Sequence, residues 1–131
     1  MTEDSPKWIS KVQVLRIHEL QIERHGGLPG LRDGGLLESA MARPQNHYVY
    51  GETDVFVLAA LYAGGIAQNH PFKDGNKRTA HATADLFLYI HGYDLEVGDV
   101  AAHVAFFERV ASGSVSREEL AKFYRETVRA L

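Results

Sequence analysis

The chain has 131 residues, no cysteine and a formal net charge of −3, because 17 Asp and Glu outnumber 14 Lys and Arg. This length supports one hydrophobic core, so we expect a single domain over residues 1–131. The lack of cysteine excludes disulfides, thiolate catalysis and cysteine-ligated zinc or iron–sulfur sites. The slightly acidic balance argues against direct binding of nucleic acid or of membrane surfaces.

No segment has the pattern of an export signal or a membrane span. The chain begins MTEDSPKW, which lacks the apolar core of a signal peptide. The longest nearly apolar stretch, residues 55–67, is too short to cross a bilayer and contains a pair of glycines. We therefore expect a cytoplasmic protein without membrane contact.

A first helix is predicted near the start of the chain. The residues SKVQ, beginning at Ser10, have the pattern of a capping box in which Gln13 reaches back to the Ser10 amide. Apolar residues follow at roughly helical spacing as far as Ile22. A glycine pair at residues 26–27 is suited to end this helix.

The next segment is predicted to be a short helix followed by a flap. Asp33 is suited to cap a helix over residues 36–43, which Pro44 is expected to end. Residues 45–53 (QNHYVYGET) are irregular and contain side chains that favour strand geometry. We expect them to form an extended flap, whose strand-prone residues are Tyr48, Val49 and Tyr50.

Two buried helices are predicted in the middle of the chain. Asp54 is suited to cap a helix over residues 55–69, which is apolar nearly all round and therefore central. A polar break over residues 70–75 follows. A second helix over residues 76–91 has a broad apolar face and Gly92 at its end.

Two more helices are predicted in the C-terminal third. Asp99 is suited to begin a helix that ends near Ala111. Residues 116–119 (SREE) repeat the capping-box pattern ahead of a helix that runs to near Leu131. About six helices with short connections favour an all-α domain of the bundle type.

The densest chemistry lies in residues 70–78, HPFKDGNKR, which join the two buried helices. The first turn of the second helix has unpaired backbone N–H groups and the positive end of the helix dipole. Gly75 allows close approach of a ligand to the backbone, Asn76 can cap or position the turn, and Lys77 and Arg78 add two positive charges. This combination predicts a phosphate-binding site at a helix N-terminus.

Two further residues of this segment supply reactive groups. His70 can remove a proton from an attacking hydroxyl near neutral pH, and Asp74 can hold Mg²⁺ beside bound phosphates. Phe72 alternates with polar neighbours and is expected to anchor the loop in the core. A base, a metal ligand, an anion site and two cations are what phosphoryl or nucleotidyl transfer requires.

The motif HPFKDGNKR resembles the signature of the Fic/Doc family, and most closely that of its Doc branch, the "death on curing" toxins. A second stretch, GLRDGGLLESAMARPQ at residues 30–45, looks like one typical of Doc-like proteins, so the resemblance covers nearly the whole chain. The Fic-type pattern reads roughly HPFxDGNGRxxR. This sequence departs from it at Lys77, in place of a glycine, and at His81, in place of the second arginine.

The resemblance implies a single Fic/Doc-type helical domain that uses ATP and Mg²⁺. In such a domain His70 would be the general base, Asp74 would orient the metal or the target hydroxyl, and Phe72 would be the structural anchor. The residues that would hold the phosphates are Gly75, Asn76, Lys77 and Arg78. The resemblance also implies a flap that docks the target peptide by strand addition, for which residues 45–53, with Tyr48, Val49 and Tyr50, are the candidate.

The resemblance also implies an activity and partners. A Doc-type member is a toxin of a type II toxin–antitoxin system that transfers the γ-phosphate of ATP to a hydroxyl of a protein, by resemblance elongation factor Tu, and so arrests translation. The alternative is Fic-type transfer of AMP, which the changes at Lys77 and His81 disfavour, and the third hypothesis is a non-catalytic regulatory module. Restraint is expected from a separate Phd-like antitoxin, whose disordered tail folds on the toxin as a helix.

Each of these residues also has a structural interpretation. A lone His70 would more often be a hydrogen-bonded structural histidine. Lys77 and Arg78 would ordinarily form a solvated first turn, although cations are unfavourable at that helix end unless an anion is near. His81 and Asp85, four residues apart on one helix, are expected to be a surface pair rather than metal ligands.

Overall fold

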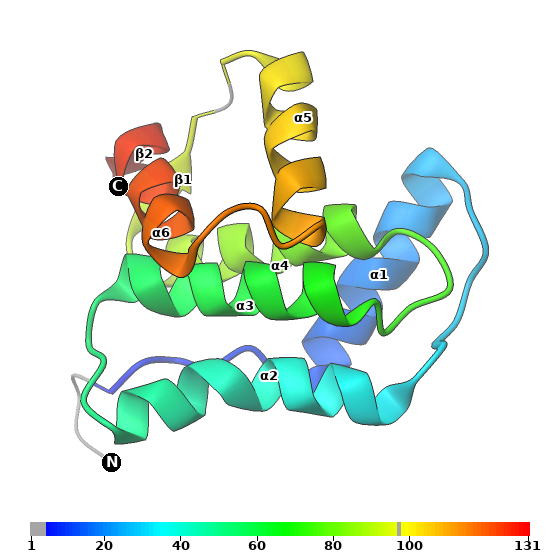
Figure 1. Cartoon of the computed structure of the whole chain (residues 1–131), viewed down its shortest axis with the longest axis horizontal. Coiled ribbons are helices and arrows are strands. Elements are labelled where there is room, and N and C mark those ends of the chain that lie inside the picture. The colour runs from blue at the N-terminus through cyan, green and yellow to red at the C-terminus, as the bar shows by residue number, and fades with distance from the viewer. Residues whose placement is uncertain (1–4, 97) are drawn as a thin grey trace.

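The computed structural model describes residues 5–96 and 98–131, and within these ranges it has six helices and one two-stranded antiparallel sheet (Figure 1). In chain order the elements are α1 (Lys11–His25), α2 (Gly34–Val49), α3 (Val55–Asn69), α4 (Asn76–Ile90), β1 (Tyr93–Leu95), α5 (Val100–Ala111), α6 (Arg117–Thr127) and β2 (Val128–Ala130). The predicted all-α class with about six helices is confirmed. Among the described residues, no helix combines the length and the apolar character that a bilayer span needs.

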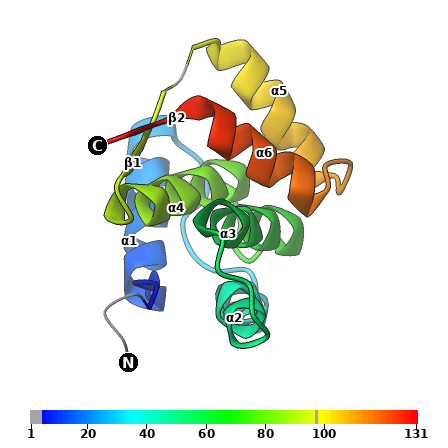
Figure 2. The same cartoon turned by 90° about the vertical axis from the view of Figure 1, so that its left-hand side faces the viewer.

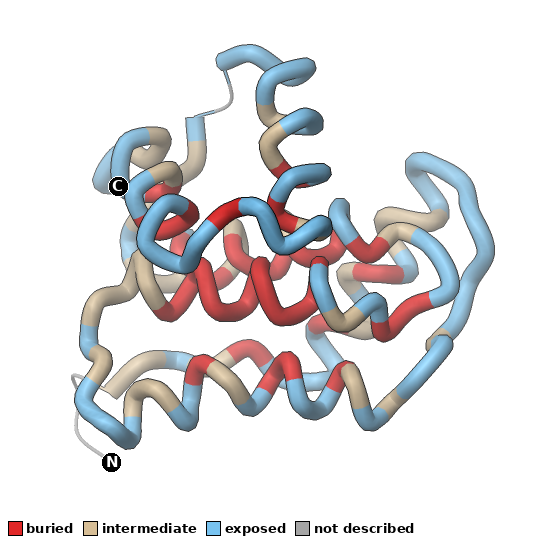
Figure 3. The backbone as a smooth tube through the Cα atoms, in the orientation of Figure 1, coloured by how far each residue is buried: buried red, intermediate tan, exposed pale blue. Residues whose placement is uncertain are grey.

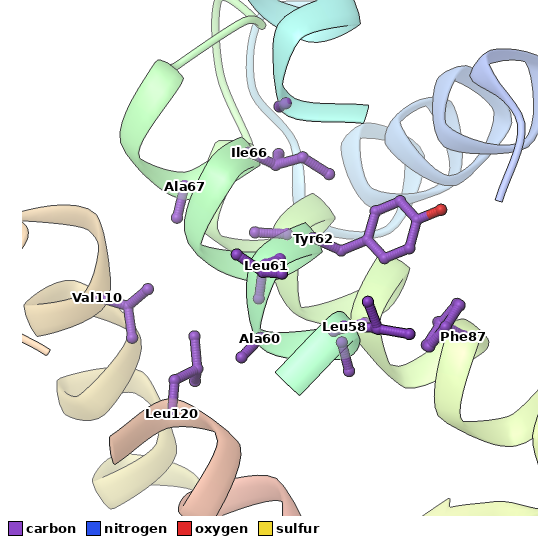
Figure 4. Close-up of a cluster of buried hydrophobic side chains, with 14 of the residues drawn as sticks. Leu58, Ala60, Leu61, Tyr62, Ile66, Ala67, Phe87, Val110 and Leu120 are labelled. Atoms are coloured by element: carbon purple, nitrogen blue, oxygen red, sulfur yellow. The ribbon is translucent and has the colours of Figure 1, made fainter. Parts of the chain in front are cut away.

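Helix α3 is the centre of the core, as its uniformly apolar sequence predicts. It contacts α2, α4, α5 and α6, and Figure 2 shows it between α2 on one side and α6 on the other. Every residue from Leu58 to Ala67 is buried, which is the red middle part of this helix in Figure 3. Figure 4 shows side chains from three other helices packed around it, among them Phe87, Val110 and Leu120. The loop with the predicted site residues connects α3 to α4, and both helices have buried residues in the core. The backbone on each side of this loop is therefore held in place.

The predicted caps at Ser10, Asp54, Asp99 and Ser116 are confirmed, whereas Asn76 does not cap α4: Gly75 is the cap residue there, and no side chain of the described residues makes a capping bond. Ser10 and Gln13 form both halves of the capping box at the start of α1. The side chains of Asp54, Asp99 and Ser116 each accept a hydrogen bond from a backbone nitrogen in the first turn of α3, α5 and α6, respectively. Local hydrogen bonding at these positions therefore sets where the helices begin.

The predicted end of the second helix at Pro44 is wrong, because α2 continues through it to Val49. Proline removes one helical hydrogen bond and crowds the carbonyl of the residue four positions earlier, Ala40. Here Pro44 is buried, and Ala40 packs so closely on α3 that a Cβ added to Gly65 would lie 3.3 Å from the Ala40 Cβ. Packing of α2 on α3 therefore maintains the helix where the local signal predicts a break.

The expected extended conformation of residues 45–53 is also wrong. Residues as far as Val49 are helical, and a turn follows at Tyr50. The last turn of α2 is held by the Tyr48 ring, which meets the Trp8 ring edge-on with centroids 5.6 Å apart. Val49 and Tyr50 point outward, with 78% and 91% of their surfaces exposed. Their docking role stays a prediction, now for a helix end rather than a strand.

The last helix ends at Thr127 rather than near Leu131. The final residues instead form β2, which pairs with β1 in a register that places Tyr93 opposite Ala130. Beyond the ladder, the Leu131 nitrogen donates to the Gly92 carbonyl at 2.8 Å. This pairing attaches the end of the chain to the end of α4, and its long-range hydrogen bonds have no local sequence signal.

The N-terminal segment is attached to the core by Tyr62 of α3. The Tyr62 hydroxyl accepts a hydrogen bond from the Ile9 backbone nitrogen at 3.0 Å, and both residues are buried. Burial raises the pKa of Tyr62 to about 12, so the phenol is neutral at physiological pH.

We predict that Tyr62→Phe lowers the free energy of unfolding by about 1–3 kcal/mol, because the buried Ile9 N–H loses its acceptor. Urea unfolding followed by circular dichroism measures the change. The control is Tyr89→Phe, at a position with 56% exposure, which should change stability by less than about 0.5 kcal/mol. Equal losses in the two variants would contradict the role assigned to Tyr62.

Candidate active site

The connection between α3 and α4 is closed by the side chain of Asn76, the first residue of α4. Its amide oxygen accepts a hydrogen bond from the Phe72 nitrogen at 2.9 Å, and its amide nitrogen donates to the Phe72 carbonyl at 3.0 Å. Both residues are buried, with 7% and 1% exposure, where an unpaired backbone group is costly. The Asn76 side chain is thus occupied by the loop, and its backbone N–H is the group left for a phosphate.

His70, the candidate base, follows the last residue of α3 in a left-handed conformation with φ of 49°. Within the described ranges it is the one residue other than glycine with positive φ, a conformation that persists only where surrounding structure holds it. His70 is exposed, and its Nδ1 lies 3.4 Å from the Asn76 amide nitrogen. Because the contacts with Phe72 orient that amide, a donor faces Nδ1, which favours the tautomer with its lone pair on Nδ1.

The loop between α1 and α2 lies beside this connection and supports it through the backbone (Figure 1). An antiparallel bridge joins Leu31 to Phe72. The backbone nitrogens of Arg32 and Asp33 both donate to the Pro71 carbonyl, at 2.7 and 3.0 Å. The second sequence motif therefore forms part of the scaffold that supports the first.

Asp74 is held by two contacts from the N-terminal third of the chain. Its Oδ2 accepts a hydrogen bond from the Leu28 backbone nitrogen at 2.8 Å, and its carbonyl accepts one from His18 Nε2, also at 2.8 Å. Since a carbonyl oxygen only accepts, His18 carries a hydrogen on Nε2. The buried His18 ring also stacks on Phe72, with centroids 3.8 Å and planes 8° apart. One carboxylate oxygen and the backbone of Asp74 are therefore fixed by the fold.

Sequence reasoning did not identify His18 or Arg32 as parts of this site. Arg32 donates from Nε to the His70 carbonyl at 2.7 Å and from Nη2 to the Asn69 carbonyl at 2.9 Å. His18 lies 56 positions before its partner Asp74. His18 has no distinctive local pattern, because it is one residue of the buried face of α1. Arg32 lies within the second motif, but its bonds to the first motif are tertiary contacts that the motif by itself does not predict.

A cavity of about 700 Å³ lies beside the first turn of α4, between α1, α4 and α5. A volume of this order is typical of small-molecule sites. His70 is not among the residues that line it, but Asn76, the neighbour of its ring, is. The predicted site residues that line the cavity are Asp74, Gly75, Asn76, Lys77 and Arg78.

The mouth of the cavity at the start of α4 is suited to an anion. Gly75 precedes the helix with a φ of 74°, which is favourable for glycine, and the first-turn N–H groups carry the positive end of the helix dipole. Lys77 and Arg78 are exposed, and neither is paired with a carboxylate within the described ranges. Two cations at this end of a helix are unfavourable by themselves, and a bound anion would stabilise them.

The far wall of the cavity combines aromatic rings with the carboxyl groups of Asp85 and Glu108. His81 contacts Phe107 of α5 edge-on, with ring centroids 4.6 Å apart, and lies near His103. Burial, followed by the charge on His103, lowers the pKa of His81 to about 4, so its imidazole is uncharged at pH 7. The Nδ1 atoms of both histidines are buried without a hydrogen-bond partner among the described residues. The expected surface pair at this position is therefore wrong: His81 belongs to the cavity wall.

Asp85, one helical turn beyond His81, also lines the cavity. Burial, followed by the charge on Asp94, raises the pKa of its carboxyl. In the part of the chain that the structure describes, no three or more His, Cys, Asp or Glu side chains form a group able to hold a metal ion.

The model of the Fic/DOC family matches residues 8–88 of this sequence, which is more than half of the chain. The chain belongs to the Fic/Doc family. It is 36% identical over 118 residues to "Protein kinase doc" of Escherichia phage P1, and the alignment covers 89% of this chain and 92% of that protein. It is 47% identical over 74 residues to "Toxin Doc" of Mycolicibacterium smegmatis, over 53% of this chain and 55% of that protein. The Doc-branch resemblance is confirmed.

The matched range contains both motifs, the supporting loop and most of α4, and it ends before α5. In this Fic/Doc chain the aromatic far wall is therefore built partly from a helix outside the matched range. Phe107 and His103 of α5 are the residues that contribute to it.

We predict that Asn76→Ala lowers the free energy of unfolding by about 2 kcal/mol, because it leaves the buried N–H and carbonyl of Phe72 unpaired. Urea unfolding measures the loss, and amide hydrogen exchange should show faster exchange at Phe72. The matched control is Asn46→Ala, at an exposed position of α2. Unchanged exchange at Phe72 would contradict this function of the Asn76 side chain.

We predict that His81→Phe reduces the dependence of stability on pH. In the wild type, the unfolded chain binds a proton at His81 below about pH 6.5, whereas the folded chain excludes it down to about pH 4. Stability is therefore lost as the pH falls through this window, by roughly 1–3 kcal/mol from this group. Urea unfolding at pH 7.5 and at pH 4.5 should show a smaller difference in the variant.

The control for this experiment is His25→Gln, at an exposed position on the edge of the same cavity. A variant at position 81 with the full wild-type pH dependence would show that the imidazole is not excluded from protonation by the fold.

Proposed function

We propose that this Fic/Doc protein is a toxin kinase that transfers the γ-phosphate of ATP to a hydroxyl of a protein. The observation that carries the proposal is the similarity to "Protein kinase doc", which extends over 92% of that protein. It is supported by the placement of Lys77 and Arg78, together with Asp74, around a cavity of about 700 Å³. His70 lies on the loop beside this cavity.

The residues of the site are suited to bind a nucleoside triphosphate together with Mg²⁺. The unpaired cations at the start of α4 and its backbone N–H groups fit phosphate oxygens. Asp74 is a hard oxygen ligand held in place by Leu28, and phosphate oxygens can complete the coordination of Mg²⁺, which is commonly bound through one or two carboxylates and substrate phosphates. When bound, Mg²⁺ would neutralise charge on the phosphates being separated.

The chain's own residues would divide the reaction between them. His70 accepts the proton of the target hydroxyl on Nδ1, which requires the hydroxyl to displace the long contact with Asn76. The hydroxyl oxygen then bonds to the γ-phosphorus as the bond to the β–γ bridging oxygen breaks, and ADP leaves. Lys77 and Arg78 stabilise the charge that develops on the transferred group and on ADP.

The side chains at positions 77 and 81 of the cavity favour transfer of the γ-phosphate over transfer of AMP. Lys77 adds a side chain where the AMP-transferring pattern has glycine, and His81 presents an uncharged imidazole where that pattern has a second arginine. Positive charge is thus concentrated at the start of α4 and missing one turn later. One strong phosphate position near the reacting hydroxyl suits a nucleotide whose γ-phosphate points there.

The partners proposed for this chain follow from the same relatives. As a toxin it would act in the cytoplasm on a protein target, for which elongation factor Tu is the proposal carried by the family resemblance. Its activity would be restrained by a Phd-like antitoxin bound as a folded helix. No contact with nucleic acid is part of this proposal.

The decisive measurement uses ATP labelled at either the α- or the γ-phosphate, together with Mg²⁺ and a bacterial lysate or purified elongation factor Tu. We predict that protein becomes labelled from γ-labelled ATP and not from α-labelled ATP. Label from the α position would show AMP transfer instead. No protein label from either nucleotide, with a folded chain, would support the non-catalytic module.

We further predict that His70→Asn abolishes this labelling, with a loss of at least about 100-fold. Asparagine tolerates the left-handed conformation at this position, so the fold should be retained. The matched control is Lys73→Ala, an exposed residue of the same loop outside the cavity lining, which should keep most of the activity. Full activity of the His70 variant would overturn the assignment of the base.

A further inference from the structure

Three successive carbonyl groups at the end of α3 accept hydrogen bonds from Arg32. Its side chain donates from Nη2 to the Asn69 carbonyl and from Nε to the His70 carbonyl. Its backbone nitrogen donates to the carbonyl of the following residue, Pro71, at 2.7 Å. One residue therefore holds the chain immediately before, at and immediately after the candidate base.

These bonds reach the C-terminal carbonyl groups of α3, which lack hydrogen-bond donors within the helix. The last carbonyls of α3 have no intrahelical donor and carry the negative end of the helix dipole. A guanidinium group is suited to such a site because it offers several donors in a rigid planar arrangement and keeps its charge. Arg32 is exposed, so its contribution to global stability is small.

These bonds hold the backbone of His70 in the left-handed conformation, which is unfavourable for a residue other than glycine. The left-handed backbone of His70 determines the direction in which its imidazole leaves the chain. On the other side, the ring has a single long contact of 3.4 Å with Asn76. The backbone bonds from Arg32 are shorter, at 2.7 and 2.9 Å, so they fix the position of the ring more firmly than the ring's own contact.

We infer that Arg32 is a positioning residue for His70. It contacts neither the cavity nor the candidate phosphate site. Its guanidinium sets the backbone conformation that directs the His70 imidazole toward Asn76 and the start of α4. This inference rests on the proposed function, because it assigns His70 the role of base.

The test compares Arg32→Ala, Arg32→Lys and the wild type in the γ-phosphate transfer assay. Loss of alignment at a reacting group costs up to about 100-fold in rate, so Arg32→Ala should lower kcat by about 10- to 100-fold. The KM for ATP should stay within about twofold, because the phosphate site is not touched. Lysine keeps the charge but only one donor group, so Arg32→Lys should recover part of the loss.

Two readouts separate positioning from general destabilisation. The thermal midpoint of Arg32→Ala should fall by no more than about 5 °C, and guanidinium ion at millimolar concentration should raise the kcat of this variant without raising that of the wild type. The matched control is Arg16→Ala, which removes an exposed arginine paired with Glu19 on α1 and should leave kcat unchanged.

Each other outcome overturns the inference. A wild-type kcat in Arg32→Ala would show that the bonds do not position the base. A drop in kcat that follows a large drop in thermal midpoint, without rescue by lysine or guanidinium, would show a purely structural role.

A measurement without activity keeps this inference separate from the proposed function. In nuclear magnetic resonance spectra, Arg32→Ala should shift the His70 ring resonances and leave those of His25 in place. If the wild type transfers no phosphate, the proposed function fails, and the His70 ring resonances alone decide whether Arg32 holds that residue. Unshifted His70 resonances would then refute the positioning role.

Discussion

Two helix ends of opposite polarity meet within a few residues of this chain. The carbonyls that end α3 carry partial negative charge, and the N–H groups that begin α4 carry partial positive charge. Only residues 70–75 separate α3 from α4. The carbonyl end needs hydrogen-bond donors, and the N–H end needs acceptors or an anion. Several groups of the site can be understood from these two needs. Arg32 satisfies the carbonyls, and Lys77 and Arg78 place two positive charges at the N–H end.

The loop can make this tight connection because both backbone groups of its buried residue, Phe72, are hydrogen-bonded. Asn76 pairs with both backbone groups of Phe72, whose ring is buried against the His18 ring. The α1–α2 loop adds backbone bonds from outside. Reactive groups can therefore be held exposed at the surface of a small domain, since the strain of their placement is borne by buried neighbours.

The cavity has an end with two cations, Lys77 and Arg78, and an aromatic end without Lys or Arg in its lining. Both arise from one helix, α4, because residues one turn apart meet different surroundings. Arg78 is exposed near the helix start, whereas His81 lies against Phe107 and keeps an uncharged ring. An uneven distribution of charge of this kind would favour one orientation of an elongated anion over the other.

Much of the fold could be predicted from local patterns, and the exceptions are instructive. The caps at Ser10, Asp54 and Asp99 are correct because a cap depends on residues within three positions of it. The predicted end at Pro44 is wrong because contact with α3 outweighs the local cost of proline. The strand at the chain end was missed because its partner lies more than thirty positions earlier.

The sequence by itself determined the helical class, the anchoring Phe72 and the cluster of motif residues at the start of one helix, since all of these depend on neighbours in the chain. Only the tertiary structure decided which groups hold them. His18 and Arg32 reach the motif from elements far away in sequence, and the neutral state of His81 requires α5 to pack over it. Hydrogen bonds and burial between distant segments arise when the chain folds, so no local pattern records them.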